Sequence, residues 1–160
     1  MAVPGVALWR IAKHTKAYRA HDLSGGGAKA SGGRWNSKGL PVVYTSQSIA
    51  LATLETLAHL GDTIAIRNAF LVRVDVPARV WANREYIDAT DFDPTWLAEP
   101  PGLTTIGFGD EWLRGGTAPL LEVPSVIVPE EKNVLINPIH PLASKIRATV
   151  AQQFVYDPRL

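Results

Sequence analysis

The feature that most constrains the fold of this chain is a series of short apolar runs, each bounded by proline or glycine. In residues 70–76 every second residue is a bulky apolar one, which predicts a strand with one packed face. Residues 145–156 are compatible with helix or strand, and the spacing of their apolar residues favours a strand. Further strands are predicted for residues 9–11, 42–45, 126–128 and 134–136.

The helices predicted from the sequence are few and short. Ser46 or Ser48 is expected to cap a helix that ends near Leu60, with Gly61 as its stop. Two shorter helices are predicted, from Asp93 to Trp96 and from Asp110 to Arg114. Several short strands mixed with few helices predict an α+β fold rather than a doubly wound α/β fold.

Composition excludes several classes of protein. The 160 residues fit one domain, and 46% of them are hydrophobic while 19% are charged, as in globular chains. The net charge of +1 argues against direct nucleic-acid binding, and the lack of cysteine excludes disulfides and thiolate metal sites. The sequence contains no signal-peptide pattern and no apolar run of about 20 residues. We therefore expect a soluble cytoplasmic protein with one domain, residues 1–160.

Three candidate functional side chains lie close together in the sequence. Arg34 follows two glycines, Tyr44 lies on a predicted strand and Glu55 lies on a predicted helix. Helical spacing puts Glu55 on the same face as Leu51 and Ala58, so its carboxylate is expected to point inward. A guanidinium, an aromatic ring and a carboxylate suit a phosphate, a flat ring and a sugar cation. An enzyme acting on NAD is therefore the leading hypothesis.

Each of these side chains also has a structural interpretation. Arg34 is able to stack on the neighbouring Trp35. Tyr44 is able to lie in the core with its hydroxyl in a hydrogen bond. Glu55 is able to form a buried ion pair. Glu55 is the hardest to explain in this way, because unpaired glutamates are rarely buried. The glycine-rich residues 24–33 are expected to form a loop that uses positive φ or allows close approach of a ligand.

Other motifs carry less weight. The glycine spacing at residues 25–30 matches a dinucleotide-binding fingerprint, but no convincing strand precedes it and no amphipathic helix is expected to follow. The four histidines are scattered without metal-ligand spacing, so no metal site is predicted. Ser125 does not lie in a nucleophile elbow. Three tryptophans are expected to leave apolar surface that gives room for a homodimer: Trp81, Trp96 and Trp112.

Six motifs occur in order along the chain: residues 22–28 (DLSGGGA), 32–36 (GGRWN), 41–46 (PVVYTS), 50–55 (ALATLE), 121–125 (LEVPS) and 133–141 (NVLINPIHP). Through these motifs the chain resembles the RES domain family from about residue 8 to residue 160. The arginine, glutamate and serine that give the family its name match Arg34, Glu55 and Ser125. The resemblance implies an active-site set completed by Arg10 and Tyr44.

The resemblance also implies a fold and a biological role. The fold would be similar to that of ADP-ribosyltransferase toxins, with central mixed β-sheets flanked by short helices. The protein would be a bacterial toxin of a type II toxin–antitoxin pair, which depletes cellular NAD by hydrolysis or phosphorolysis. Its partner would be an Xre-like antitoxin that covers the active site, and NAD would be a substrate rather than a cofactor. The same motifs fit a protein ADP-ribosyltransferase, which is the alternative.

The chemistry of NAD suggests a role for each residue. Nicotinamide leaves NAD as a neutral molecule, so one carboxylate suffices where most glycosidases need two. Glu55 is expected to engage the ribose 2′-hydroxyl and stabilise the oxocarbenium charge. Tyr44 would stack on nicotinamide, Arg34 and Arg10 would hold the pyrophosphate, and Ser125 would bond to the carboxamide or the ribose. In the remaining alternative, a non-catalytic protein-binding module, these side chains form an internal structural cluster.

Overall fold

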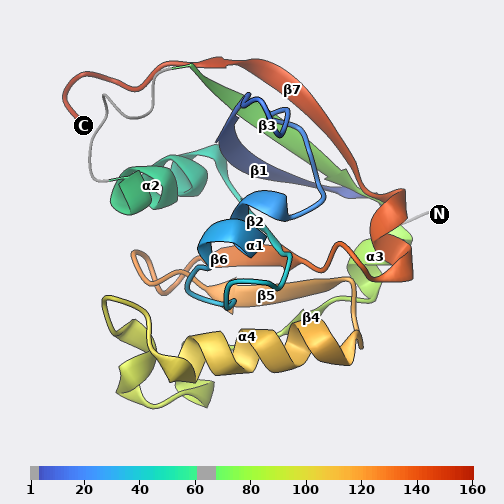
Figure 1. Ribbon diagram of the computed structural model, residues 1–160, viewed down its shortest axis with the longest axis vertical. Helices are drawn as coiled ribbons and strands as arrows, with labels where there is room; N and C mark the ends of the chain where they lie inside the picture. The colour runs from blue at the N-terminus through green and yellow to red at the C-terminus, as the bar shows by residue number, and fades with distance from the viewer. Residues whose placement is uncertain (1–3, 61–67) are drawn as a thin grey trace.

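The computed structural model describes residues 4–60 and 68–160, and within them seven strands form one mixed sheet (Figure 1). The order across the sheet is β4-β5-β6-β2-β1-β3-β7, with β4 and β5 parallel and the other pairs antiparallel. This arrangement confirms the predicted α+β class. The strands are β1 (Val6–Lys13), β2 (Val43–Ser46), β3 (Ala69–Val76), β4 (Glu85–Tyr86), β5 (Leu120–Pro124), β6 (Lys132–Ile136) and β7 (Arg147–Phe154).

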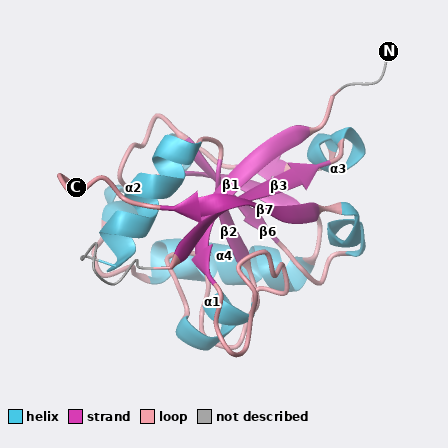
Figure 2. Ribbon diagram, turned by 90° about the horizontal axis from the view of Figure 1, so that it is seen from above, coloured by secondary structure: helices cyan, strands magenta, loops and turns pink. Residues whose placement is uncertain are grey.

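Short helices lie around the strands (Figure 2). In the view of Figure 1, α4 lies beyond β5 at one end of the molecule, and α2 packs against β1 and β2. No helix among the described residues is long and apolar enough to cross a membrane. The α-helices are α1 (Gly26–Ser31), α2 (Ile49–Leu60), α3 (Ala78–Ala82) and α4 (Leu103–Gly115), and the 3-10 helices are η2 (Ala89–Asp91), η3 (Pro94–Leu97) and η4 (Pro141–Lys145).

Two apolar clusters hold the strands and helices together. Along β6 the side chains alternate between them, with Val134 and Ile136 in the first cluster and Leu135 in the second. Along β2, Val43 enters the first cluster while Tyr44 packs against the second. The second cluster is formed by Trp35, Val42, Trp112, Leu113, Leu121, Val123 and Leu135, and so joins α4 and the loop after α1 to the sheet.

Helix α4 anchors the segment that carries Arg34. The buried Asp110 accepts hydrogen bonds from the Ser37 backbone N–H at 2.8 Å and from the Ser37 hydroxyl at 2.5 Å. One residue earlier, Gly109 lies so close to Trp35 that an added Cβ would come within 1.7 Å of the Trp35 carbonyl oxygen. Helix and loop therefore meet in a close contact that requires glycine.

The glycine-rich stretch contains a short helix, so the prediction of a loop there is wrong. Gly25 has a φ of 75° and its carbonyl accepts the Lys29 N–H at 3.0 Å, which begins α1. A Cβ on Gly25 would meet the Val42 nitrogen at 2.6 Å, so both conformation and space require glycine. The expectation of positive φ in this stretch is confirmed.

Residues 126–128 form a bend rather than the predicted strand. Strand β5 ends at Pro124, and the Ser125 Oγ accepts the backbone N–H groups of Ile127 and Val128, both at 3.1 Å. These bonds satisfy locally the N–H groups that a strand would give to a neighbour. The other predicted strands are confirmed with shifted ends, and they correspond to β1, β2, β3, β6 and β7.

The predicted cap of α2 is confirmed at Ser48, whose hydroxyl accepts the Leu51 N–H at 3.0 Å. The predicted stop at Gly61 lies outside the described residues. The inward face of α2 was only partly predicted: Leu51 is buried and Glu55 is partly buried, but Ala58 is exposed. Glu55 therefore sits at the margin of the core, where its carboxylate is accessible.

The remaining helices differ from the prediction in type or length. Asp93 caps the 3-10 helix η3 by accepting the Thr95 N–H at 2.8 Å, so the cap is confirmed although the helix is not α. The helix predicted to begin at Asp110 is the second half of α4, which ends at the left-handed Gly116 as expected. Trp96 and Trp112 are buried, so the prediction that they supply apolar surface is wrong.

Gly109→Ala is expected to destabilise the protein by about 1–3 kcal/mol, because the methyl group overpacks the contact with the Trp35 carbonyl. Gly107→Ala in the same helix is the matched control, since nothing lies within 4 Å of its added Cβ. There alanine should stabilise the helix by up to about 1 kcal/mol. Urea unfolding measures both changes, and equal midpoints for the two variants would contradict the close contact.

Candidate active site

Glu55 lies at the centre of a hydrogen-bond network built from α2, β6 and the bend after β5. Its Oε1 atom accepts the Ser125 hydroxyl at 2.7 Å and the Asn133 Nδ2 group at 2.6 Å. Among the described residues, no donor is bound to Oε2. The carboxylate is thus fixed through one oxygen, while the other oxygen has its acceptor positions open for a ligand.

Ser125 is fully buried and all of its hydrogen-bonding positions are used. Its Oγ accepts the N–H groups of Ile127 and Val128, so its single proton goes to Glu55. The direct bond to substrate that we predicted for Ser125 would require one of these bonds to break. In the observed geometry Ser125 contacts Glu55 and fixes the position of its carboxylate through this hydrogen bond.

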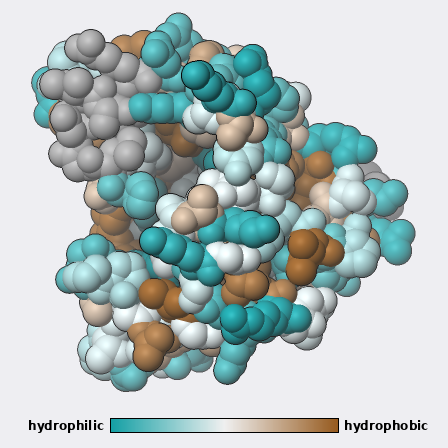
Figure 3. Space-filling view, in the orientation of Figure 1, coloured by the Kyte–Doolittle hydropathy of each residue, from teal (hydrophilic) through white to brown (hydrophobic). Residues whose placement is uncertain are grey.

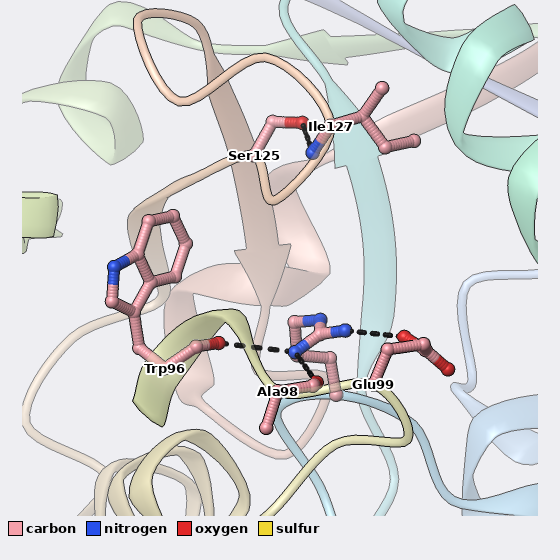
Figure 4. Close-up of polar contacts among 6 residues, drawn as sticks. Trp96, Ala98, Glu99, Ser125 and Ile127 are labelled. Carbon is pink, nitrogen blue, oxygen red and sulfur yellow. Dashed lines mark hydrogen bonds and ion pairs between the residues drawn. The ribbon is translucent and has the colours of Figure 1, made fainter. Parts of the chain in front are cut away.

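Arg34 is bound to η3 and to the two residues that follow this helix, and its partners Trp96, Ala98 and Glu99 are labelled in Figure 4. Its Nη1 donates to the carbonyl oxygens of Trp96 at 3.1 Å and Ala98 at 2.9 Å, and its Nη2 pairs with the Glu99 carboxylate at 2.7 Å. The Arg34 side chain is 16% exposed and that of Glu99 is 76% exposed. These three bonds leave two of the five guanidinium N–H groups without a partner in the described chain.

Tyr44 supports the loop that carries Arg34. Its hydroxyl accepts the Trp35 backbone N–H at 3.0 Å and donates to Asn36 Oδ1 at 2.7 Å. Burial raises the pKa of the Tyr44 phenol above its ordinary value of 10.0, and the Trp35 N–H and the Arg34 cation act in the opposite direction. Because Trp35 directly follows Arg34, the bond from its N–H places the Tyr44 hydroxyl beside the backbone that carries Arg34.

Arg10 projects from β1, and it forms no hydrogen bond with Glu55, Arg34 or Tyr44. Strand alternation puts it on the side of Leu8, opposite to Trp9, which pairs with Ser46. Burial lowers the pKa of the Arg10 guanidinium, and the nearby Asp22 carboxylate opposes this shift. Within the described ranges the guanidinium donates no hydrogen bond, so its N–H groups are available to an anion.

The structure joins Glu55 with Ser125, and Tyr44 with the residue that follows Arg34, while Arg10 forms no hydrogen bond with any of them. Strand β2 links the first two pairs. Tyr44 and Ser46 are two residues apart on the same face of β2, about 7 Å along the strand. The Ser46 hydroxyl donates to Asn133 Oδ1 at 2.7 Å, and Asn133 in turn bonds to Glu55.

Sequence reasoning missed Asn133 and Ser46 as members of this network. Both lie inside the motifs at residues 133–141 and 41–46, so the family resemblance marked the segments but not the residues. A single asparagine at the start of a strand forms no sequence pattern with other residues that would indicate a site. Only the register of β2 against β6, which pairs Ser46 with Asn133, brings the two side chains together.

Other surface features do not add to this site. A cavity of about 320 Å³ is lined by Pro77, Arg79, Val80, Leu142, Lys145 and Arg147, none of which was a predicted site residue. On the face drawn in Figure 3, hydrophobic groups are scattered among hydrophilic ones rather than gathered in one broad patch. In the part of the chain that the structure describes, no three His, Asp or Glu side chains are placed to bind a metal ion.

Comparison with known proteins gives consistent matches along almost the whole chain. The RES domain family model matches residues 7–157. The "Prs ADP-ribosylating toxin" of Sphingobium sp. (strain YBL2) is 47% identical over 154 residues, which cover 96% of each chain. "Toxin Res" of Yersinia enterocolitica (serotype O:8 / biotype 1B) is 35% identical over 154 residues, 96% of this chain and 98% of its own.

A solved structure has the same fold. The crystal structure of the M. tuberculosis MbcT–MbcA toxin–antitoxin complex contains a chain that superimposes with a TM-score of 0.67. The match covers 94% of this chain and 86% of that one, at 14% sequence identity. At this identity the match shows the shared fold alone.

Tyr44→Phe is expected to lower the free energy of unfolding by about 1–3 kcal/mol, because the Trp35 N–H and the Asn36 Oδ1 lose their partner. The loss should also change the pH dependence of stability. The raised pKa means that the folded state keeps the phenol proton at a pH where the unfolded state has released it.

The wild-type free energy of unfolding is therefore expected to fall as pH rises above about 10, by at most about 1.4 kcal/mol per pH unit from this group. The fall should be shallower in Tyr44→Phe. Urea unfolding between about pH 8 and about pH 11 measures the difference. Parallel pH profiles for the two proteins would contradict the burial of a neutral phenol at this position.

Proposed function

The chain belongs to the RES domain family, and we propose that it is a toxin that breaks the bond between nicotinamide and ribose in NAD. The observation that carries the proposal is the Glu55 carboxylate, which is held through Oε1 by two donors. Its Oε2 atom has no donor among the described residues. A fixed anion with one open oxygen is suited to stabilise positive charge that develops on a bound sugar.

The reaction needs no acid to protonate the leaving group. When the bond from ribose C1′ to the pyridinium nitrogen breaks, its electron pair neutralises the ring, and nicotinamide departs uncharged. The ribose is left as an oxocarbenium ion, which an acceptor then attacks at C1′. In this scheme Glu55 Oε2 accepts a hydrogen bond from the 2′-hydroxyl and stabilises the cation, while Ser125 holds Glu55 in place.

Arg34 supplies a binding group for the pyrophosphate in this proposal, whereas the position of Arg10 on the face of β1 opposite to Trp9 does not support the same role for it. Arg34 has two N–H groups without a partner in the described chain. Guanidinium groups bind phosphate oxygens through short charge-assisted hydrogen bonds. Tyr44 contributes its ring face to nicotinamide, since its hydroxyl is already used to support the loop.

The acceptor distinguishes two candidate activities. The 47% identical relative is named for ADP-ribosylation, which supports transfer of ADP-ribose to a protein as the first candidate. NAD hydrolysis or phosphorolysis, in which water or phosphate attacks C1′, uses the same groups in the same way and is the second. A module that only binds protein fits less well, because an open carboxylate oxygen adds nothing to a structural cluster.

We also propose that an Xre-like antitoxin neutralises the protein by covering Glu55. The structural relative was solved as a toxin–antitoxin complex, and the proposal extends that pairing to this chain. A saturating amount of the cognate antitoxin should abolish NAD turnover. NAD turnover that continues in the complex would rule out this mode of neutralisation.

Glu55→Gln is expected to slow NAD turnover at least about 100-fold, because the neutral amide no longer stabilises the oxocarbenium charge. The glutamine keeps an oxygen that can accept the Ser125 and Asn133 bonds, so folding and NAD binding should persist. The matched control is Glu111→Gln, which changes an exposed glutamate on α4. Undiminished turnover by Glu55→Gln would remove Glu55 from the reaction.

Incubation with NAD labelled in its adenylate part should place the label on a protein acceptor when the chain is added to a bacterial extract. Gel electrophoresis detects the labelled protein, and chromatography detects small-molecule products. Free ADP-ribose, or ADP-ribose carrying an added phosphate, without labelled protein would favour hydrolysis or phosphorolysis instead. Intact NAD after long incubation would contradict both activities.

A further inference from the structure

We propose that Asn133 is a positioning residue for Glu55, and that Ser46 orients Asn133 for this task. The kinetic part of this inference rests on the proposed function, whereas the network itself can be tested without any substrate. Three side chains form the chain of contacts. Ser46 Oγ lies 2.7 Å from Asn133 Oδ1, and Asn133 Nδ2 lies 2.6 Å from Glu55 Oε1.

The donor and the acceptor of each hydrogen bond between Ser46, Asn133 and Glu55 follow from the carboxylate at which the series ends. An ionised carboxylate only accepts hydrogen bonds, so the amide nitrogen of Asn133 must face Glu55. The amide oxygen of Asn133 then faces Ser46, which must donate its proton. Ser125 also donates to Glu55, because its two acceptor positions are occupied. Both side-chain donors therefore converge on the same carboxylate oxygen.

Asn133 is held more firmly than the glutamate that it contacts. Its backbone pairs with Ser46 of β2 on one side and with Val123 of β5 on the other, in the interior of the sheet. Ser46 is 4% exposed, so the hydroxyl that donates to Asn133 is shielded from water. Glu55, by contrast, reaches the sheet through a long flexible side chain on α2. The strand residues thus fix the position of the helix residue.

Two donors on Oε1 determine where Oε2 points. If Asn133 is removed, Ser125 alone remains, and the carboxylate can rotate about a single hydrogen bond. A misplacement of about 1 Å in a reacting group can cost about 100-fold in rate while substrate binding is retained. Loss of Asn133 should therefore lower kcat and leave KM almost unchanged.

The kinetic test is a double-mutant cycle. Asn133→Ala should lower kcat for NAD cleavage about 10–100-fold with KM changed less than about 3-fold. Ser46→Ala should lower kcat less, about 3–10-fold, because it removes one neutral hydrogen bond. In the Asn133→Ala background, Ser46→Ala should have no further effect on kcat, since Ser46 acts through Asn133. Full additivity in the cycle, or a change in KM alone, would overturn the inference.

The control is Asn83→Ala, which removes an exposed side chain whose amide bonds only to the Arg79 carbonyl in the described chain. It should leave kcat and KM at the wild-type values. Melting temperatures of all variants show whether a loss of activity reflects unfolding.

An NMR measurement tests the network without NAD. The side-chain amide protons of Asn133 should shift in Glu55→Gln, which removes the charged acceptor, and in Ser46→Ala, which removes the donor to Oδ1. Amide resonances unchanged in both variants would overturn the inference even if the wild type consumes NAD. Conversely, shifted resonances in a protein that does not consume NAD would refute the proposed function and leave the network established.

Discussion

The alternation of side chains along β2 is the constraint on which the rest of the site depends. Tyr44 and Ser46 leave the strand on the same face, because successive residues point to opposite sides. The Tyr44 hydroxyl supports the loop of Arg34, and the Ser46 hydroxyl bonds to the asparagine that contacts Glu55. Strand β2 is paired on both sides, with β6 and β1. A shift of β2 by one residue would move both hydroxyls to the other face and disrupt both halves of the site.

Much of the fold could be predicted because the signals for strands and caps are local. The alternation in residues 70–76 and the serine before α2 are read directly from neighbouring residues. The run Val126-Ile-Val has the composition of a strand, and only the Ser125 hydroxyl, which bonds the next two N–H groups, makes it a bend. Helix α4 was predicted too short because glycine weakens a helix in isolation. In the folded protein Gly109 is required by the contact with Trp35.

For the site, the sequence indicated which side chains carry chemistry but not which of them touch. Glu55 and Ser125 are 70 residues apart, and Glu55 and Asn133 are 78 apart. No periodicity relates such distant positions. The contacts arise because β5, β6 and β2 are neighbours in the sheet, and α2 follows β2 closely enough to bring Glu55 back over them. The partners of Arg34 were hidden for the same reason, since two of them are backbone carbonyls that any residue could supply.

Arg34 is held by two kinds of contact that differ in strength. The carbonyl oxygens of Trp96 and Ala98 belong to a segment that is packed into the core through the buried Trp96 ring. Glu99 is 76% exposed, and ion pairs with so exposed a partner contribute at most about 1 kcal/mol. A phosphate that replaces Glu99 against the guanidinium therefore loses little and gains charge-assisted hydrogen bonds. Under the proposed function, the backbone carbonyls orient the arginine before the substrate arrives, and Glu99 occupies the place that a phosphate oxygen takes.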